Sequence, residues 1–309
     1  MGADYDILIL GAGPAGLTAG VYAARARRSV LILDTATVGG QTVLTEKVAN
    51  YPGVAETSGR ALSQTMAGQA RAFGCEITPF ARLRSVDLVS EVKSVTFAND
   101  RRVTARAVIV ATGGVPRQLG VDNEERFVGR GISFCATCDG EFFTDRPIAV
   151  VGGGNSALEE AVSLSQYASR ITLIHEFDHF QAEPWIVAEA RANEKIDLLM
   201  NQRVLGFVGD TGLAGVRSRD KDSGEVVETA VDGCFVFVGY VPNSAPFAGQ
   251  LALSERGEVL TDGVLRTSQP GVFAAGDVRQ TGVRQITTAV ADGTIAALSA
   301  LDFLNEGVA

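Results

Sequence analysis

Short apolar runs and glycine-rich segments alternate along the N-terminal part of the chain. Residues 6–10 (DILIL) are mostly apolar, and the segment 11–16 (GAGPAG) follows them directly. A helical pattern then extends to about residue 26, and a second apolar run, 30–33, ends at Asp34. Apolar runs of this length, bounded by turn residues, are typical of buried strands. The segment therefore predicts a strand, a tight glycine turn, a helix and a second strand.

The same pattern recurs near residue 150. Its parts are an apolar run at 148–151 (IAVV), a glycine turn at 152–157 (GGGNSA), a helical pattern at 158–167 and an apolar run at 171–174 (ITLI). Asp34 lies 23 residues after Gly11, and His175 lies 23 residues after Gly152. The matching spacing predicts two similar nucleotide-binding units.

Further runs complete the predicted elements. They are a turn-rich loop at 39–53, short strands within 75–105, a buried strand at 107–113, a second strand-then-glycine run at 234–239, a strand ending at Asp277 and a helix from about 285 to 304. Proline and glycine concentrate at 114–117 and 240–246, which predicts domain joints there.

The composition narrows the class of protein. A length of 309 residues suggests about two domains, and 46% apolar residues provide for a packed core. Glycine is high, at 35 residues, so many positions need a close approach or a positive φ. The net charge of −9 disfavours nucleic acid as a partner. We expect neither a signal peptide nor a membrane-spanning run of about 18 residues, and therefore a cytoplasmic protein.

The first glycine turn has the spacing G-x-G-x-x-G. Gly11 permits the tight turn, Gly13 lets a pyrophosphate approach the backbone, and Gly16 lets helix and strand pack closely. The helix N-terminus supplies free N–H groups for phosphate. Asp34 can accept a hydrogen bond from a ribose hydroxyl. The alternative is a glycine turn that serves packing alone.

Two of the four cysteines, Cys135 and Cys138, have the spacing C-x-x-C and are followed by Asp139. Such a pair can form a reversible disulfide, and a carboxyl whose pKa is raised by burial can shuttle protons. A zinc site would need further ligands nearby, so no metal is expected. Coincidental free thiols stay open as an alternative. Cys75 and Cys234 lie in or beside apolar runs and are interpreted as core residues.

Three other features have a structural and a functional interpretation. Phe142 and Phe143 are interpreted first as core residues or as a domain-packing contact, with partner docking as the alternative. Trp185 either packs or covers an aromatic ring of a ligand. His175 and His179 are expected at a strand end and in a loop, which disfavours a metal site there.

Six motifs in order resemble the low-molecular-weight thioredoxin reductases, over essentially the whole chain. They are GAGPAG at 11–16, GGQ at 39–41, NYPG at 50–53, CATCD at 135–139, GGGNSA at 152–157 and GD at 276–277 with RQ at 284–285. The resemblance implies an α/β fold of two Rossmann-like three-layer dinucleotide-binding domains, the second inserted into the first. It implies FAD-binding parts at 1–115 and 246–309, and an inserted domain at 116–245 with the redox cysteines.

The same resemblance implies residue roles. It places along FAD the residues Gly11, Gly13, Pro14, Ala15, Gly16, Asp34, Gly40, Gln41, Asn50, Ala111, Thr112, Gly113, Gly276, Asp277, Arg284, Gln285 and Ile286. Cys138 would be the flavin-proximal thiol, Cys135 the thiol that attacks the partner disulfide, and Asp139 the acid. It also implies thioredoxin or a similar disulfide protein as the acceptor, and a homodimer whose inserted domain rotates.

The second nucleotide site departs from the NADPH-dependent relatives. It keeps a turn and strand end formed by Gly152, Gly154, Asn155, Ser156, Ala157, His175 and Glu176. Those relatives carry arginines at the positions of Glu176, Phe177 and Gln181, whereas 175–183 holds three carboxylates and no Lys or Arg. A phosphate dianion needs cationic donors, and a carboxylate about 4 Å away repels it by roughly 1–4 kcal/mol. NADPH is therefore expected to bind poorly, unless arginines such as Arg170 or Arg191 compensate.

A second departure is Tyr240, which stands where NADPH-dependent relatives often have His. The prediction is a flavin-dependent disulfide oxidoreductase most similar to the NADPH-independent members, the ferredoxin-dependent flavin thioredoxin reductases or the diflavin-linked disulfide oxidoreductases. NADH, a second FAD and ferredoxin stay open as donors. Two alternatives are an NADH- or NADPH-dependent thioredoxin reductase and a flavin-binding redox sensor without turnover.

Overall fold

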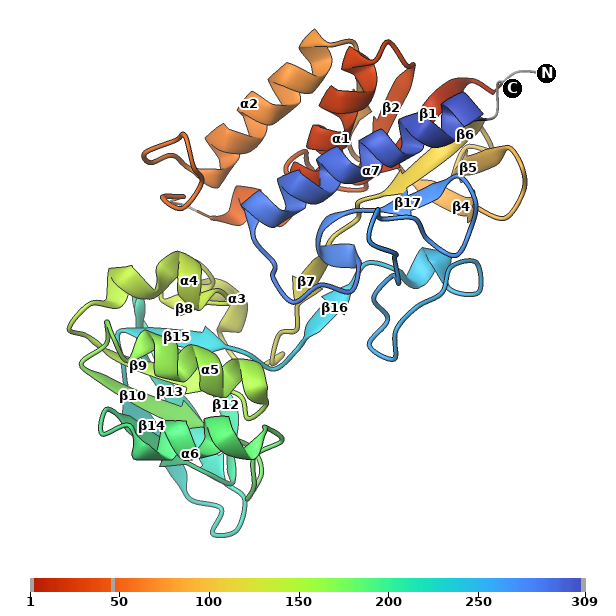
Figure 1. Cartoon of the computed structure of the whole chain (residues 1–309). Coiled ribbons are helices and arrows are strands. Elements are labelled where there is room, and N and C mark those ends of the chain that lie inside the picture. Colours follow the sequence, from red (N-terminus) through yellow and green to blue (C-terminus); the bar gives the residue numbers. More distant parts are fainter. Residues whose placement is uncertain (1–2, 46–47, 307–309) are drawn as a thin grey trace. The chain divides into compact units, whose positions relative to one another are not determined.

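The chain divides into two compact units in a computed structural model that describes residues 3–45 and 48–306 (Figure 1). Unit 1 combines Met1–Val115 with Val241–Ala309, and unit 2 is Pro116–Tyr240. Unit 2 is therefore inserted into the sequence of unit 1. The two connections run through β7 (Gly114–Pro116) and β16 (Tyr240–Pro242), which pair with each other.

The chain returns to unit 1 five residues earlier than the predicted boundary at 245. Asn243 explains the difference, because its backbone N–H donates to the Gly113 carbonyl at 2.9 Å and its side-chain amide donates to the Thr112 carbonyl at 2.9 Å. The Thr112 hydroxyl donates back to the Asn243 carbonyl at 2.8 Å. These bonds hold Asn243 to unit 1, although the prolines at 242 and 246 give the segment the appearance of a linker.

Unit 1 is built on a seven-stranded sheet. Its strands are β1 (Tyr5–Leu10), β2 (Val30–Leu33), β3 (Glu76–Thr78), β4 (Leu83–Asp87), β5 (Lys93–Phe97), β6 (Arg102–Val110) and β17 (Val272–Ala274). Strands β3, β2, β1 and β6 are parallel in that order, β17 pairs with the end of β6, and β5 and β4 extend the other part of β6 antiparallel. Ile7 and Ile9 pack into one core and Leu8 and Leu10 into the other, as strand alternation requires.

Helices α1 (Pro14–Arg25), α2 (Gly59–Ala72) and α7 (Ile286–Glu306) pack against the face of Ile7 and Ile9, with α1 beside α7 (Figure 1). A Cβ added at Gly293 would collide with the Ala15 backbone, so glycine permits this close helix approach. Among the described residues, α7 alone is long and apolar enough to cross a membrane, by length and composition only. Its residues Ala296, Ala300 and Leu304 are buried in the core of unit 1, as in a core helix of a soluble domain.

Unit 2 is built on two sheets, one parallel and one antiparallel. A parallel sheet has the order β11 (Ile196–Leu199), β10 (Arg170–Ile174), β9 (Pro147–Val151), β15 (Gly233–Val236) and β8 (Ile132–Ser133). Helices α5 (Asn155–Leu164) and α6 (Pro184–Ala192) share one core with this sheet. The antiparallel strands β12 (Gln202–Gly209), β13 (Leu213–Asp220) and β14 (Val226–Ala230) form a separate sheet, of which β12 and β13 share the other core. The short helices are α3 (Glu124–Phe127) and α4 (Ala136–Asp139).

The predicted fold class is confirmed, and the elements around the two glycine turns lie close to their predicted positions. Helices α2 and α6 and strands β11 to β14 were not predicted. Helix α5 runs from Asn155 to Leu164, three residues earlier than predicted, and β6 begins five residues before the predicted start at 107. Gly154 is its N-cap and Ala157 N–H already bonds to the Gly154 carbonyl at 3.0 Å, so the glycine turn passes directly into the helix.

Candidate functional site

The glycine turn of unit 1 has the shape that a pyrophosphate requires. Gly11 has φ +111°, and a Cβ there would collide with the Ala111 carbonyl. A Cβ at Gly16 would collide with the Gly11 carbonyl, whereas a Cβ at Gly13 would meet nothing within 4 Å. Pro14 opens α1, and no side chain caps its N-terminus. The outer glycines are therefore needed for packing, and the middle one leaves the backbone accessible to a ligand.

Asp34 lies just after β2, and its carboxylate contacts the glycine turn. One oxygen accepts the Ala12 backbone N–H at 2.7 Å, and the other accepts the Ala36 N–H at 2.7 Å. An ionised carboxylate offers about four lone-pair sites, so each oxygen can still accept a ribose hydroxyl. Asp34 thus has a structural role that the sequence did not predict, and this role is compatible with the predicted one.

The segment with Gly40 and Gln41 runs beside the same turn. The Gly39 N–H donates to the Ala12 carbonyl at 2.8 Å. A Cβ added at Gly40 would lie 3.3 Å from the Gly13 Cα. The short helix Gly40–Leu44 therefore forms one side of the accessible glycine turn.

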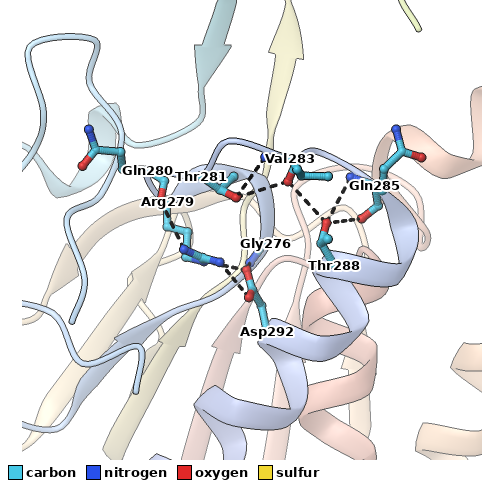
Figure 2. Close-up of polar contacts among 8 residues, drawn as sticks. All are labelled: Gly276, Arg279, Gln280, Thr281, Val283, Gln285, Thr288 and Asp292. Atoms are coloured by element: carbon cyan, nitrogen blue, oxygen red, sulfur yellow. Dashed lines mark hydrogen bonds and ion pairs between the residues drawn. The ribbon is translucent and has the colours of Figure 1, made fainter. Parts of the chain in front are cut away.

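Asn50 and Gln285 meet in the structure although 235 residues separate them. The Asn50 side-chain amide donates to the Gln285 side-chain oxygen at 3.3 Å. Gln285 directly precedes α7, and its backbone N–H donates to the Thr288 hydroxyl at 3.1 Å (Figure 2). Two residues that the resemblance assigns to one ligand thus lie together at the N-terminus of α7.

Gly276 and Asp277 form a turn that a buried ion pair supports (Figure 2). The Gly276 N–H donates to the Asp292 carboxylate at 3.0 Å, and the Arg279 guanidinium donates to both oxygens of that carboxylate. Sequence reasoning missed Arg279 and Asp292. The available signal was a single acidic residue in the mostly apolar stretch 289–301 of α7, since such a residue needs a partner when buried.

Arg284 engages a second acid that the sequence did not single out. Its guanidinium donates to Glu258 at 2.6 Å, and Glu258 also accepts the Ser254 hydroxyl at 3.1 Å. Glu258 therefore fixes the position of the Arg284 side chain, which is predicted to contact FAD.

The structure joins Cys135 and Cys138 of unit 2 in a disulfide, with a Cα–Cα distance of 5.3 Å. Helix α4 carries Cys138 and Asp139, and Cys135 is its N-cap residue. Burial raises the pKa of Asp139, and a hydrogen bond from Ser133 at 2.6 Å opposes that rise. Within the described residues, no group of three or more His, Cys, Asp or Glu side chains could hold a metal ion. The arrangement supports reversible disulfide chemistry beside a carboxyl that binds a proton more tightly than usual.

The second glycine turn repeats the geometry of the first. A Cβ at Gly152, where φ is +145°, would collide with the Phe237 carbonyl, whereas one at Gly154 would meet nothing within 4 Å. The His175 ring lies against Gly153, so a side chain at that glycine would collide with the ring. The Asn155 side-chain oxygen accepts the Glu183 N–H at 2.7 Å, which holds the following loop to the start of α5.

The loop after β10 presents Glu176, and two cations from elsewhere in unit 2 lie beside it. The Arg203 Nε lies 4.0 Å from the Glu176 carboxylate. The Lys221 ammonium donates to the Glu176 backbone carbonyl at 3.1 Å and lies 4.9 Å from the centre of the Phe177 ring. Arg170, proposed from sequence as a compensating cation, instead pairs with Asp197. Proximity in space across β12 and β13 was not visible in the sequence.

The aromatic residues near these sites differ from their simplest interpretation. Phe143 packs edge-on against Phe235, with ring centres 5.4 Å apart, as predicted for a core residue. Phe142 is 42% exposed and Trp185 is 58% exposed, so neither side chain is buried in the core of unit 2. Cys75 and Cys234 are buried, as predicted.

Comparisons with known proteins cover nearly the whole chain. Residues 5–293 match the family of pyridine nucleotide-disulphide oxidoreductases. The chain is 41% identical over 303 residues to a thioredoxin reductase of Bacillus subtilis (strain 168), which covers 98% of this chain and 95% of that protein. It is 40% identical over 303 residues to one of Peptoclostridium acidaminophilum, with 96% of each covered. The crystal structure of a thioredoxin reductase from Streptococcus pyogenes is similar with a TM-score of 0.92, 39% identity and 98% of each chain covered.

Proposed function

This chain belongs to the low-molecular-weight thioredoxin reductase family, and from that premise we propose that its Cys135–Cys138 disulfide takes two electrons from a bound flavin and passes them to thioredoxin. The main support for this proposal is the Cys135–Cys138 disulfide. Reduced by two electrons, it becomes a dithiol. One thiolate attacks the partner disulfide, the second resolves the mixed disulfide, and the partner leaves as a dithiol.

We propose that FAD is held by unit 1. The support is the accessible backbone at Gly13, the Asp34 carboxylate and the grouping of Asn50 with Gln285. When bound, FAD supplies the two-electron redox chemistry that these side chains lack. The protein would orient the cofactor through the remaining predicted residues and through the N-terminus of α7, which favours negative charge.

In unit 2, Cys135 would attack the partner disulfide and Cys138 would exchange electrons with the flavin. Asp139 would hold the proton that the leaving thiolate takes up. The raised pKa of this carboxyl supports the role, because a group that keeps its proton nearer to neutral pH is a more effective acid there.

We also propose that NADPH is a poor electron donor and that NADH is the first candidate in its place. The support is the Glu176 carboxylate after β10, where it can accept a ribose hydroxyl but repels a 2′-phosphate. Arg203 and Lys221 lie beside Glu176 and are already engaged with it and with Phe177. The relatives are named for thioredoxin and not for a donor. A second flavin and ferredoxin are the next candidates.

The test is anaerobic titration of the purified yellow protein with each nucleotide, following the visible band of oxidised flavin. We expect NADH to bleach the band at concentrations at which NADPH leaves it unchanged. Dithionite is the control that the flavin can be reduced at all. Bleaching by micromolar NADPH would make the chain an ordinary NADPH-dependent enzyme and would contradict the donor proposal alone.

The alternative function, a flavin-binding sensor without turnover, is distinguished by the acceptor. Insulin reduction through thioredoxin, with the flavin reduced chemically, should proceed if the chain is an enzyme and fail if it is a sensor. We further propose a cytoplasmic homodimer. The support is the exposed pair Ile295 and Leu298 on one side of α7, and the measurement is the mass of the purified protein by light scattering.

A further inference from the structure

Ser133 lies at the centre of the polar contacts around the redox disulfide. It ends β8 two residues before Cys135, and it is 7% exposed. Its hydroxyl donates to the Asp139 carboxylate at 2.6 Å and accepts the Cys135 backbone N–H at 3.1 Å. The Cys135 carbonyl lies 3.3 Å from the same hydroxyl. One side chain therefore contacts both the first cysteine of the motif and the acid that ends it.

A hydroxyl suits a carboxyl that gains and loses a proton. When Asp139 is ionised, Ser133 donates its proton to the carboxylate. When Asp139 is protonated, the carboxyl donates and the Ser133 proton can turn to the Cys135 carbonyl. A buried polar group without a partner is costly, and a group that both donates and accepts satisfies Asp139 in either state.

The charged groups of the neighbouring elements do not replace this contact. Helix α4 packs against α5 and against the short helix Gly140–Phe143, and β8 pairs with β15. The titratable residues on those elements are Glu141, Glu159, Glu160 and Cys234. The causes of the altered pKa of Asp139 are burial, which raises it, and the Ser133 hydrogen bond, which lowers it.

We propose that Ser133 is a positioning residue for disulfide exchange, which acts by holding the Asp139 carboxyl against the redox motif in both protonation states. The inference rests on the proposed role of Asp139 as the acid. In the step concerned, an external thiolate attacks Cys135, the Cys135–Cys138 bond breaks, and the Cys138 thiolate takes the Asp139 proton. A second thiol of the reductant then releases Cys135, so that two electrons and two protons pass to the cysteine pair.

The test is the rate at which dithiothreitol reduces the disulfide in the full-length protein with its flavin, measured anaerobically by alkylation of the new thiols. The rate is divided by the dithiothreitol thiolate concentration at each pH. In the wild type this normalised rate should fall as Asp139 loses its proton. In Ser133→Ala the low-pH rate should drop about tenfold, because a displaced acid transfers protons less well, and the midpoint of the fall should move to higher pH.

Three variants isolate the role of the hydroxyl. Ser133→Thr keeps it and should restore the wild-type midpoint. Asp139→Asn should remove the pH dependence, and Ser133→Ala in that background should change nothing further. Ser218→Ala removes a different buried hydroxyl of unit 2, one that donates to Gln202 at 2.9 Å, and should leave the profile unchanged.

An unmoved midpoint in Ser133→Ala, a failure of Ser133→Thr to restore it, or an added effect on Asp139→Asn would overturn the proposal. Far-UV circular dichroism checks that each variant folds. If Ser133→Ala does not fold, the pH profiles of Ser133→Thr and Asp139→Asn test the proposal. The assay needs neither a nucleotide donor nor thioredoxin. A wild type that fails to reduce thioredoxin but shows the expected dithiothreitol profile would therefore contradict the proposed function and leave the role of Ser133 supported.

Discussion

The Asp292 carboxylate, inside α7, binds the Arg279 guanidinium through two hydrogen bonds, at 2.6 and 2.8 Å (Figure 2). The two side chains are only 8% and 20% exposed. The same carboxylate accepts the Gly276 N–H at 3.0 Å. The pair thus ties the longest helix of unit 1 to the turn that carries Asp277, a residue predicted to contact FAD. Removing one partner of such a pair leaves a poorly compensated charge in the interior.

We expect Asp292→Asn to lower the free energy of unfolding by about 3 kcal/mol, because Arg279 keeps its charge and loses its anion. The variant should also retain less FAD during purification, since the Gly276 N–H and the Arg279 guanidinium then compete for one amide oxygen in place of two carboxylate oxygens. Urea unfolding and the ratio of flavin to protein absorbance measure the two effects. Asp100→Asn is the matched control, because Asp100 pairs with Arg84 on the exposed surface of the same unit. Equal destabilisation by both variants would contradict the structural role given to Asp292.

Local pattern was enough to predict the elements around the two glycine turns. Gly11 and Gly152 follow apolar strands and precede helices, which the sequence shows directly. The backbone that excludes a side chain at these glycines lies far along the chain, at Ala111 after β6 and at Phe237 after β15. The disulfide was predictable from local spacing, since its two cysteines are three residues apart.

Pairs that meet only after folding were not predictable. Asn243 lies 131 residues from Thr112, and Glu258 lies 26 residues from Arg284, with no periodic pattern to join them. Phe142 and Phe143 are neighbours of the same type, yet one is exposed and the other packs on Phe235, because a short helical turn directs adjacent side chains differently. Contacts of this kind cannot be predicted from one sequence, because no local pattern connects the residues that form them.

The reactivity of the four cysteines should follow their burial. Burial raises the pKa of Cys75 to about 11, and burial also raises the pKa of Cys234. At pH 8 neither thiol should react with Ellman's reagent in the folded protein, because the thiolate is the reactive form. We therefore expect no reactive thiol in the oxidised protein and two after mild reduction. Unfolding in guanidinium should raise these values to two and four. A fast-reacting thiol in the oxidised folded protein would contradict the pairing of Cys135 with Cys138.

Glu176→Arg should shift donor preference toward NADPH. The substitution removes a carboxylate that repels the 2′-phosphate and adds a guanidinium that can bind it, beside Arg203 and Lys221. We expect the KM for NADPH to fall about tenfold or more relative to that for NADH. Stopped-flow reduction of the flavin at varied nucleotide concentration measures both values.

Asp178→Arg provides the matched control for Glu176→Arg. It makes the same charge change in the same loop, but the Asp178 side chain is 77% exposed against 48% for Glu176, and it pairs with His179 and not with Arg203. Its effect on the two KM values should be small and should weaken with added salt, as for an exposed charge. If both variants improve NADPH to the same extent, the net charge of unit 2 and not the position of Glu176 would determine donor preference.

Asp139 should make the protein less stable at neutral pH than in mild acid. Burial raises the pKa of its carboxyl above the ordinary value of 3.8, so the folded chain holds a proton that the unfolded chain has already released. The stability due to this proton is fully present below the unfolded pKa and is lost as pH rises through the folded pKa. Asp139→Asn does not titrate and should therefore exceed the wild type in urea midpoint at pH 7, while the difference narrows toward pH 4.

The comparison needs a variant in which an exposed carboxyl is lost. Asp232→Asn removes an exposed carboxyl of the same unit, and its urea midpoint gives the general effect of losing one carboxyl at each pH, which is subtracted. A pH-independent difference for Asp139→Asn after this subtraction would mean that burial does not hold the Asp139 proton. If the difference does grow with pH while thioredoxin turnover falls, then the carboxyl that destabilises the fold at neutral pH is the one that the exchange reaction needs.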